Sequence, residues 1–124
     1  MNGRTKTFGI IEKAVRVRVF PDAGNAPSFT SQGGVASVSR VSAGLFRITL
    51  QDAYFSNVEK QATYSAGANN VDLYAQFQGI SNLGTSTPVT VDVALKTGAV
   101  NTDAPAAAAN NHIDVTLVFE DSAA

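Results

Sequence analysis

Hydrophobic and polar residues alternate along much of this chain with a period of two, which is the pattern of β-strands. The alternation is clearest in five segments: residues 15–20, 45–50, 71–78, 89–96 and 113–120. Each segment has one apolar face and one mostly polar face. Antiparallel strands that cover a core on one side need this arrangement, so we expect these segments to form antiparallel sheets.

Weaker alternation predicts two further strands, at residues 34–41 and 58–65. The segment Ser42–Gly44 follows the first of these and is expected to form a tight hairpin turn, because glycine readily adopts a positive φ. The pattern therefore predicts an all-β fold, an antiparallel β-sandwich or open barrel of about seven strands. We assign residues 14–124 to this single β domain.

Three further segments lack the alternation. Residues 1–13 combine basic side chains with a few apolar ones, and we expect them to form a flexible N-terminal arm that orders on a partner. Their apolar stretch, Phe8–Ile11, is too short for the core of a signal peptide. Residues 50–58 are compatible with one short helical turn. Residues 98–111 favour a surface loop over a two-turn helix.

The composition excludes several classes of protein. The chain has 124 residues, which is the size of one domain, with no cysteine and one histidine. Disulfide scaffolds and thiolate metal sites are therefore excluded. Nine basic and ten acidic residues give a net charge of −1, which argues against nucleic-acid binding through bulk charge. No run approaches the roughly 20 apolar residues that cross a bilayer, so we expect no membrane partner.

Residues capable of catalysis are few. His112 is the one candidate base, and it lies where a predicted strand begins. Asp92 and Asp114 are the nearest candidates for a pair of glycosidase carboxylates, but each lies on the polar face of a strand, where acidic residues are usually solvated. The sequence has no Gly-x-Ser-x-Gly motif, and its acidic residues are dispersed. We therefore predict no catalytic, cofactor or metal site and do not expect an enzyme.

Some residues on the outward faces of the strands point to a contact surface. Arg16 and Arg18 share one strand face and fit an anion-binding stripe, half of a subunit contact, or a solvated face. Phe20, Tyr74 and Val118 also occupy outward positions. An apolar patch of this kind suggests oligomerisation or docking, because monomers rarely expose one.

Aromatic residues leave sugar binding open as an alternative. Tyr54, Phe55, Tyr64 and Tyr74 lie off the regular apolar faces, where rings can form a stacking platform. Few basic residues flank them, which disfavours single-stranded nucleic acid as the ligand.

The segment Gly34–Tyr54, GVASVSRVSAGLFRITLQDAY, resembles a run found in small structural proteins of tailed bacteriophages. That run has a V-x-x-V-x-R strand, a Ser/Ala-Gly hairpin and a second strand that ends in L-x-D-x-Y. The last residues, HIDVTLVFEDSAA after a long Ala/Asn-rich loop, are similar to the closing strand of the same group. The resemblance covers roughly residues 34–124 and is most specific at Ser39–Tyr54.

The resemblance implies a virion protein, and in particular a capsid decoration (cement) protein that binds the assembled capsid lattice and stabilises it. Its implied partners are the major capsid protein and further copies of itself, as a homotrimer. Its implied location is the capsid exterior, after synthesis in the bacterial host cytoplasm. A minor tail or neck component, or a module that binds host-surface carbohydrate, is the alternative. The candidate capsid or subunit contacts are Phe8, Ile10, Ile11, Arg16, Arg18, Phe20 and Tyr74.

Overall fold

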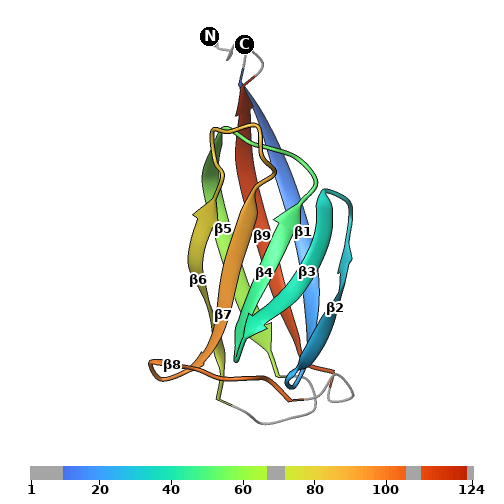
Figure 1. Cartoon of the computed structure of the whole chain (residues 1–124), viewed down its shortest axis with the longest axis vertical. Helices are drawn as coiled ribbons and strands as arrows, with labels where there is room; N and C mark the ends of the chain where they lie inside the picture. Colours follow the sequence, from blue (N-terminus) through green and yellow to red (C-terminus); the bar gives the residue numbers. More distant parts are fainter. Residues whose placement is uncertain (1–9, 67–71, 106–109, 123–124) are drawn as a thin grey trace.

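The computed structural model describes residues 10–66, 72–105 and 110–122 and is all-β (Figure 1). These residues form nine strands and no helix. The strands are β1 (Ile10–Asp22), β2 (Asn25–Ser31), β3 (Val35–Ser42), β4 (Leu45–Leu50), β5 (Ser56–Ser65), β6 (Tyr74–Ser81), β7 (Thr90–Thr97), β8 (Val100–Asn101) and β9 (His112–Ser122).

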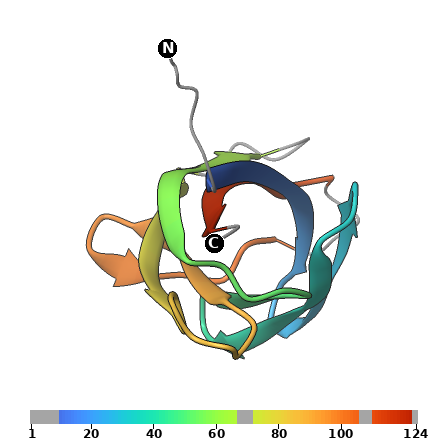
Figure 2. The ribbon, with the colours of Figure 1, turned by 90° about the horizontal axis from the view of Figure 1, so that it is seen from above.

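Two antiparallel sheets pack face to face. Sheet A has the order β2-β1-β9-β5, and sheet B has the order β3-β4-β7-β6, with the short β8 paired to β7. Seen from above, the two sheets enclose a common core (Figure 2). The predicted antiparallel β-sandwich is confirmed, and each of the seven expected strands has a counterpart. The structure adds β2 and β8, which the alternation did not predict.

The core consists of the apolar faces that the alternation identified. In β9, Ile113, Val115, Leu117 and Phe119 are at most 1% exposed, and they alternate with partly exposed residues. The inward-facing residues of β1, β4 and β7 are buried against them. Each fully buried side chain of this size contributes about 1.5–3 kcal/mol relative to an exposed one, so these four strands provide most of the apolar stabilisation.

Strand β1 begins earlier than residue 14, where we expected the β domain to start. The segment Ile10–Lys13 pairs with Phe119–Ser122 of β9 and therefore belongs to sheet A. Of the expected N-terminal arm, residues 1–9 lie outside the described residues, and Phe8 is among them. The backbones of Ile10 and Ile11 pair with Ser122 and Asp121, and their side chains lie outside the described part of the structure.

Two local expectations differ from the structure. The helical turn proposed within residues 50–58 is wrong, because this stretch leads into β5 without a helix. In β6 the register shifts between Phe77 and Gly79, which returns Ile80 to the core side and extends the strand to Ser81. A prediction that assumes a strict period of two ends this strand too early, because the bulge inserts one extra residue and reverses the alternation after it. The expected loop at residues 98–111 contains β8, and its residues 106–109 lie outside the described residues.

Candidate interaction face

The outer face of sheet A brings together three of the predicted contact residues. Arg16, Arg18 and Phe20 occupy alternate positions of β1, while the intervening valines are buried. Tyr74 is the first residue of β6, so it belongs to sheet B. The structure therefore separates Tyr74 from the other three and places Arg16, Arg18 and Phe20 on one surface.

Arg18 is neutralised by a partner directly across the sheet. Its Nε donates a hydrogen bond to Oδ1 of Asp114 at 2.7 Å, and its Nη2 donates to Oδ2 at 3.2 Å. This fork raises the pKa of Arg18 above its ordinary value, through the hydrogen bonds first and the nearby charge second. Because the carboxylate of Asp114 compensates the charge of its guanidinium group, Arg18 offers little charge to a binding partner.

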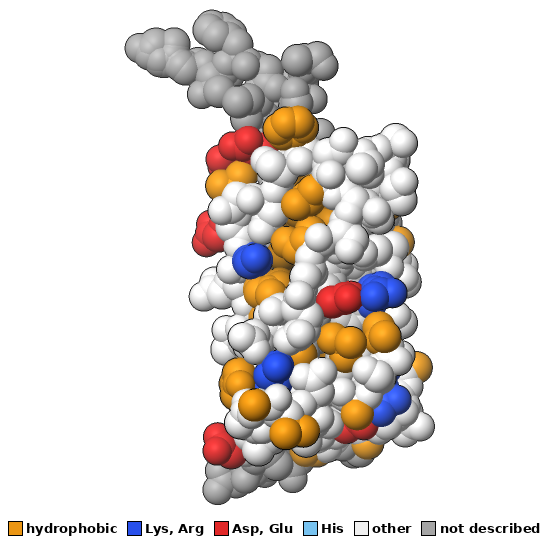
Figure 3. All heavy atoms as spheres, turned by 60° about the vertical axis from the view of Figure 1, so that its left-hand side comes forward, with side chains coloured by type: hydrophobic (Ala, Val, Ile, Leu, Met, Phe, Trp, Pro, Cys, Tyr) orange, Lys and Arg blue, Asp and Glu red, His pale blue; other side chains and the backbone are white. Residues whose placement is uncertain are grey.

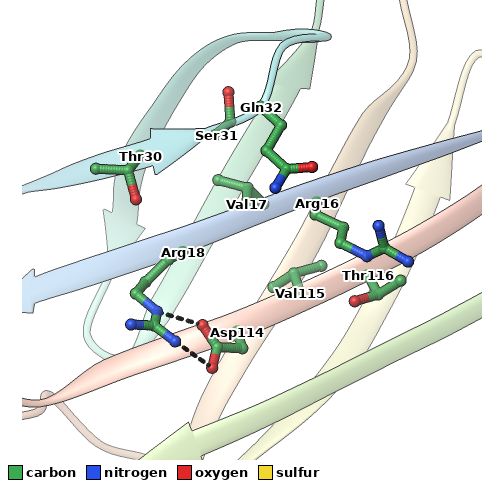
Figure 4. Close-up of a pocket in the computed structure, with 9 residues that line it drawn as sticks. All are labelled: Arg16, Val17, Arg18, Thr30, Ser31, Gln32, Asp114, Val115 and Thr116. Carbon is green, nitrogen blue, oxygen red and sulfur yellow. Dashed lines mark hydrogen bonds and ion pairs between the residues drawn. The ribbon is translucent and has the colours of Figure 1, made fainter.

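Arg16 has a different environment. It lies directly opposite Thr116 and makes no ion pair with any residue that the structure describes. A shallow hollow of ≈ 450 Å³ opens beside it, lined by hydroxyl and amide groups as well as the Arg18–Asp114 pair (Figure 4). The lining residues are Arg16, Val17, Arg18, Thr30, Ser31, Gln32, Asp114, Val115 and Thr116. This hollow can accept an anionic group at Arg16, because no described carboxylate compensates that guanidinium and the neighbouring hydroxyl and amide groups can donate hydrogen bonds.

His112 and Phe20 continue the same surface beyond Asp114. The two rings meet edge to face, with centroids 6.2 Å apart, and Nε2 of His112 lies 3.6 Å from Oδ2 of Asp114. Phe20, His112, Asp114 and Arg18 thus form one connected cluster across β1 and β9. Phe20 is half-buried at its outward position, and the imidazole ring of His112 contacts it there.

The two aspartates considered for glycosidase chemistry cannot serve one substrate. Asp114 lies on the outer face of sheet A, whereas Asp92 lies on sheet B, opposite Arg47. Arg47 donates two hydrogen bonds to Asp92, at 2.8 and 3.0 Å. Each carboxylate is therefore held by an arginine on its own sheet, and the core of the sandwich separates them.

The four aromatic residues considered as a sugar platform do not share a face. Tyr54 is 3% exposed and stacks on Phe119, with ring centroids 4.5 Å apart and planes 11° from parallel. Tyr64 donates a hydrogen bond to Oδ1 of Asn111 at 3.2 Å, and burial raises its pKa. Tyr74 donates to the carbonyl of Gly98. Phe55 is exposed and directly precedes β5, whereas Tyr74 is the first residue of β6, and these two strands begin at opposite ends of the sandwich (Figure 1).

Apolar side chains also run along the side of the molecule where β5 and β6 face each other (Figure 3). The ammonium group of Lys60, on edge strand β5, lies 5.8 Å from the ring centroid of Phe77 on β6. Lys60 pairs with the buried Leu117, so it occupies a core-side position at the edge of its sheet. A charge that points inward at a sheet edge discourages pairing with another chain.

No protein-family model matches this chain, and no curated protein or solved structure matches it. Within the described ranges, no group of three histidine or acidic side chains is arranged to hold a metal ion. The same residues contain no helix with the length and apolar character needed to span a bilayer.

Proposed function

We infer that this chain is a structural protein of a tailed-phage virion, a capsid decoration protein that binds the assembled capsid lattice and stabilises it. The observation that carries this proposal is the resemblance of residues 34–54 and of the C-terminal segment to small phage structural proteins. Its proposed partners are the major capsid protein and further copies of this chain. Its proposed location is the capsid exterior.

The two resembling segments meet in the core. Residues 34–54 span β3, the hairpin turn, β4 and Tyr54, and the C-terminal segment forms β9. Tyr54 at the end of the first segment stacks on Phe119 of the second. The resemblance therefore covers residues that build the sandwich, and this supports a shared framework.

The outer face of sheet A supports a binding role. It presents the cation of Arg16 in a hollow lined by hydroxyl and amide groups, beside a cluster of paired charges and rings. A protein that binds only the assembled lattice stabilises that lattice by mass action. Many identical sites add avidity, so each contact can be modest.

Cosedimentation with capsids tests this proposal. The purified chain is mixed with expanded capsids that lack it, and in parallel with unexpanded capsids. We expect it to pellet with the expanded particles and to raise their melting temperature. Failure to bind either particle would contradict the proposal.

The role proposed for the N-terminal arm needs its own variant. Because Ile10–Lys13 pair with β9, a deletion that tests the arm must stop at residue 9. We expect the deletion of residues 1–9 to abolish capsid binding and to leave the far-UV circular dichroism spectrum unchanged. Unchanged binding would remove the arm from the proposal and leave the outer face of sheet A as the contact surface.

A further inference from the structure

Arg16 differs from the other arginines that the structure describes. Arg18, Arg40 and Arg47 each donate two hydrogen bonds to an aspartate. Arg16 is exposed and forms no ion pair with any described residue. A guanidinium group without a counter-ion binds carboxylates well, because its planar N–H donors match the two carboxylate oxygens. Among the described arginines, Arg16 is therefore the one whose charge is available to another molecule.

The hollow beside Arg16 adds neutral hydrogen-bond donors to this charge. Thr116 lies directly opposite Arg16 on β9, and Gln32 follows the end of β2. Both side chains line the hollow together with Arg16 (Figure 4). A hydroxyl group and a side-chain amide can each donate a hydrogen bond to a carboxylate oxygen. The hollow can therefore complete the hydrogen bonds of a carboxylate that Arg16 attracts.

Acidic residues elsewhere on this face limit what can approach. Glu12 lies four residues before Arg16 on β1, a separation of about 13 Å, and Glu120 lies directly opposite Glu12. Glu59 lies on β5, opposite Val118 of β9. None of these three carboxylates forms an ion pair with a described residue. An extended acidic surface would be repelled by them, whereas a single carboxylate at Arg16 would meet the uncompensated cation first.

The hollow also favours a carboxylate over a phosphate. Asp114 lines it as well, and the charge of Asp114 is compensated by the two hydrogen bonds from Arg18. Arg16 therefore supplies the uncompensated positive charge of the lining. A phosphate group carries close to two negative charges at neutral pH, which exceeds that supply. A carboxylate carries one negative charge and matches it.

We propose that Arg16 binds a single carboxylate on the assembled capsid, from an Asp or Glu side chain of the major capsid protein. This inference rests on the proposed function and adds the chemistry of the contact. The capsid surface around that carboxylate is neutral or basic, because it must also lie near the glutamates of this face. Ala14 and Val118 lie between Arg16 and the Glu12–Glu120 pair, so the contact between the two charged rows is apolar.

Capsid cosedimentation of charge variants tests this contact. Arg16→Glu should lower the affinity for expanded capsids about tenfold, because the reversed charge meets the capsid carboxylate. Arg16→Lys keeps the charge but loses the planar fork of donors, so it should lower the affinity by a smaller factor. Lys96→Glu, the same charge reversal on sheet B, is the matched control and should bind like the wild type. Added salt should reduce the difference between Arg16→Glu and the wild type.

An NMR titration of the wild-type chain tests the site without the capsid. The Nε–Hε signals of the arginines are followed while acetate is added, and inorganic phosphate is used in a second series. The signal that is missing from the Arg16→Lys spectrum belongs to Arg16. We expect it to shift at a lower concentration of acetate than of phosphate, whereas the signals of Arg18 and Arg40 should barely move. Thr116→Val should raise the acetate concentration at half the shift about threefold, because it removes one donor.

The two experiments separate the ways in which the proposal can fail. Wild-type binding that Arg16→Glu leaves unchanged, or that Lys96→Glu weakens equally, would overturn it. An Arg16 signal that ignores acetate, or that responds first to phosphate, would overturn the carboxylate as the ligand. If the wild type bound no capsid, the proposed function would fail and the capsid would no longer be the source of the carboxylate. The titration would still decide whether Arg16 binds one, so the two failures are distinguishable.

Discussion

Arg40 holds Asp103 across 63 residues of sequence with two hydrogen bonds, from Nε at 3.0 Å and from Nη2 at 2.7 Å. Oδ1 of Asp103 also accepts a hydrogen bond from the backbone N–H of Gly44 at 2.9 Å. One carboxylate therefore ties the segment after β8 to strand β3 and to the β3–β4 turn. We call these contacts of Asp103 with Arg40 and Gly44 the clip. The clip is partly buried, whereas the Arg18–Asp114 pair is more exposed.

The clip predicts a specific dependence of stability on pH. The hydrogen bonds from Arg40 first, and that from Gly44 next, hold the pKa of Asp103 below its ordinary value of 3.8, against an opposing effect of burial. A depressed pKa in the folded state means that the unfolded state binds more protons as the pH falls. The contribution of Asp103 is thus present above its unfolded pKa and is lost as the pH falls through its folded pKa.

The variant Asp103→Asn should therefore be less stable than the wild type at pH 7, and the difference should shrink as the pH falls below 3.8, the ordinary pKa of the group. Urea unfolding at a series of pH values measures this difference. Asp92→Asn, which breaks the more exposed pair with Arg47, is the control and should cost less. A difference between Asp103→Asn and wild type that stays constant down to pH 2 would contradict the role assigned to the clip.

Gly44 is predicted to be the least replaceable of the described glycines. It has φ +65°, and a Cβ atom there would lie 2.5 Å from the nitrogen of Thr102 and 2.8 Å from the carbonyl oxygen of Leu95. Gly98 has a similar φ of +61° but open space around it. Gly98→Ala should cost about 1–2 kcal/mol from backbone strain alone, and Gly44→Ala should cost clearly more. Urea unfolding measures the loss of unfolding free energy in each variant. Equal losses in Gly44→Ala and Gly98→Ala would show that the structure relieves the close contacts at position 44 and would contradict the prediction.

Tyr54 and Phe55 are neighbours in sequence with opposite roles. Tyr54 is 3% exposed and stacks on Phe119, whereas Phe55 is 61% exposed. Tyr54→Ala should destabilise the fold by about 3–5 kcal/mol, because it removes a buried ring from the core. Phe55→Ala should stay within about 0.5 kcal/mol, as surface substitutions usually do. Chemical denaturation of both variants checks this, and similar losses would contradict the packing described for Tyr54.

Lys60 is predicted to act against aggregation. It lies on the core side of edge strand β5 and over the ring of Phe77. Lys60→Val should leave the fold intact but increase light scattering during a thermal ramp, because the edge loses its inward charge. Lys96→Val, on the inner strand β7, is the control and should not change the scattering. Equal light scattering from the Lys60→Val and Lys96→Val variants would contradict a protective role for Lys60.

The strands that bury one face could be predicted from the sequence, because burial imposes a period of two on β1, β4, β7 and β9. Strand β2 could not be predicted this way. It is an edge strand with mostly exposed residues, and Phe29 is its one large apolar side chain. The bulge at Phe77–Gly79 breaks the period, so the end of β6 was also missed.

The candidate face could be predicted in part. The alternation correctly placed Arg16, Arg18 and Phe20 on one surface, because they share a strand. The difference between Arg16 and Arg18 could not be predicted, since it depends on Asp114, which lies 96 residues later in the chain than Arg18. The pairing of β1 with β9 brings these residues together, and no local pattern encodes that pairing.

The copy number of this chain in purified virions tests the central proposal most directly. Quantitative mass spectrometry, with the major capsid protein as the internal standard, measures it. A capsid decoration protein predicts a number within a small factor of that of the major capsid protein. A number tens of times lower would place the chain in the tail, the neck or a fibre, and its absence from the particle would contradict the virion role altogether.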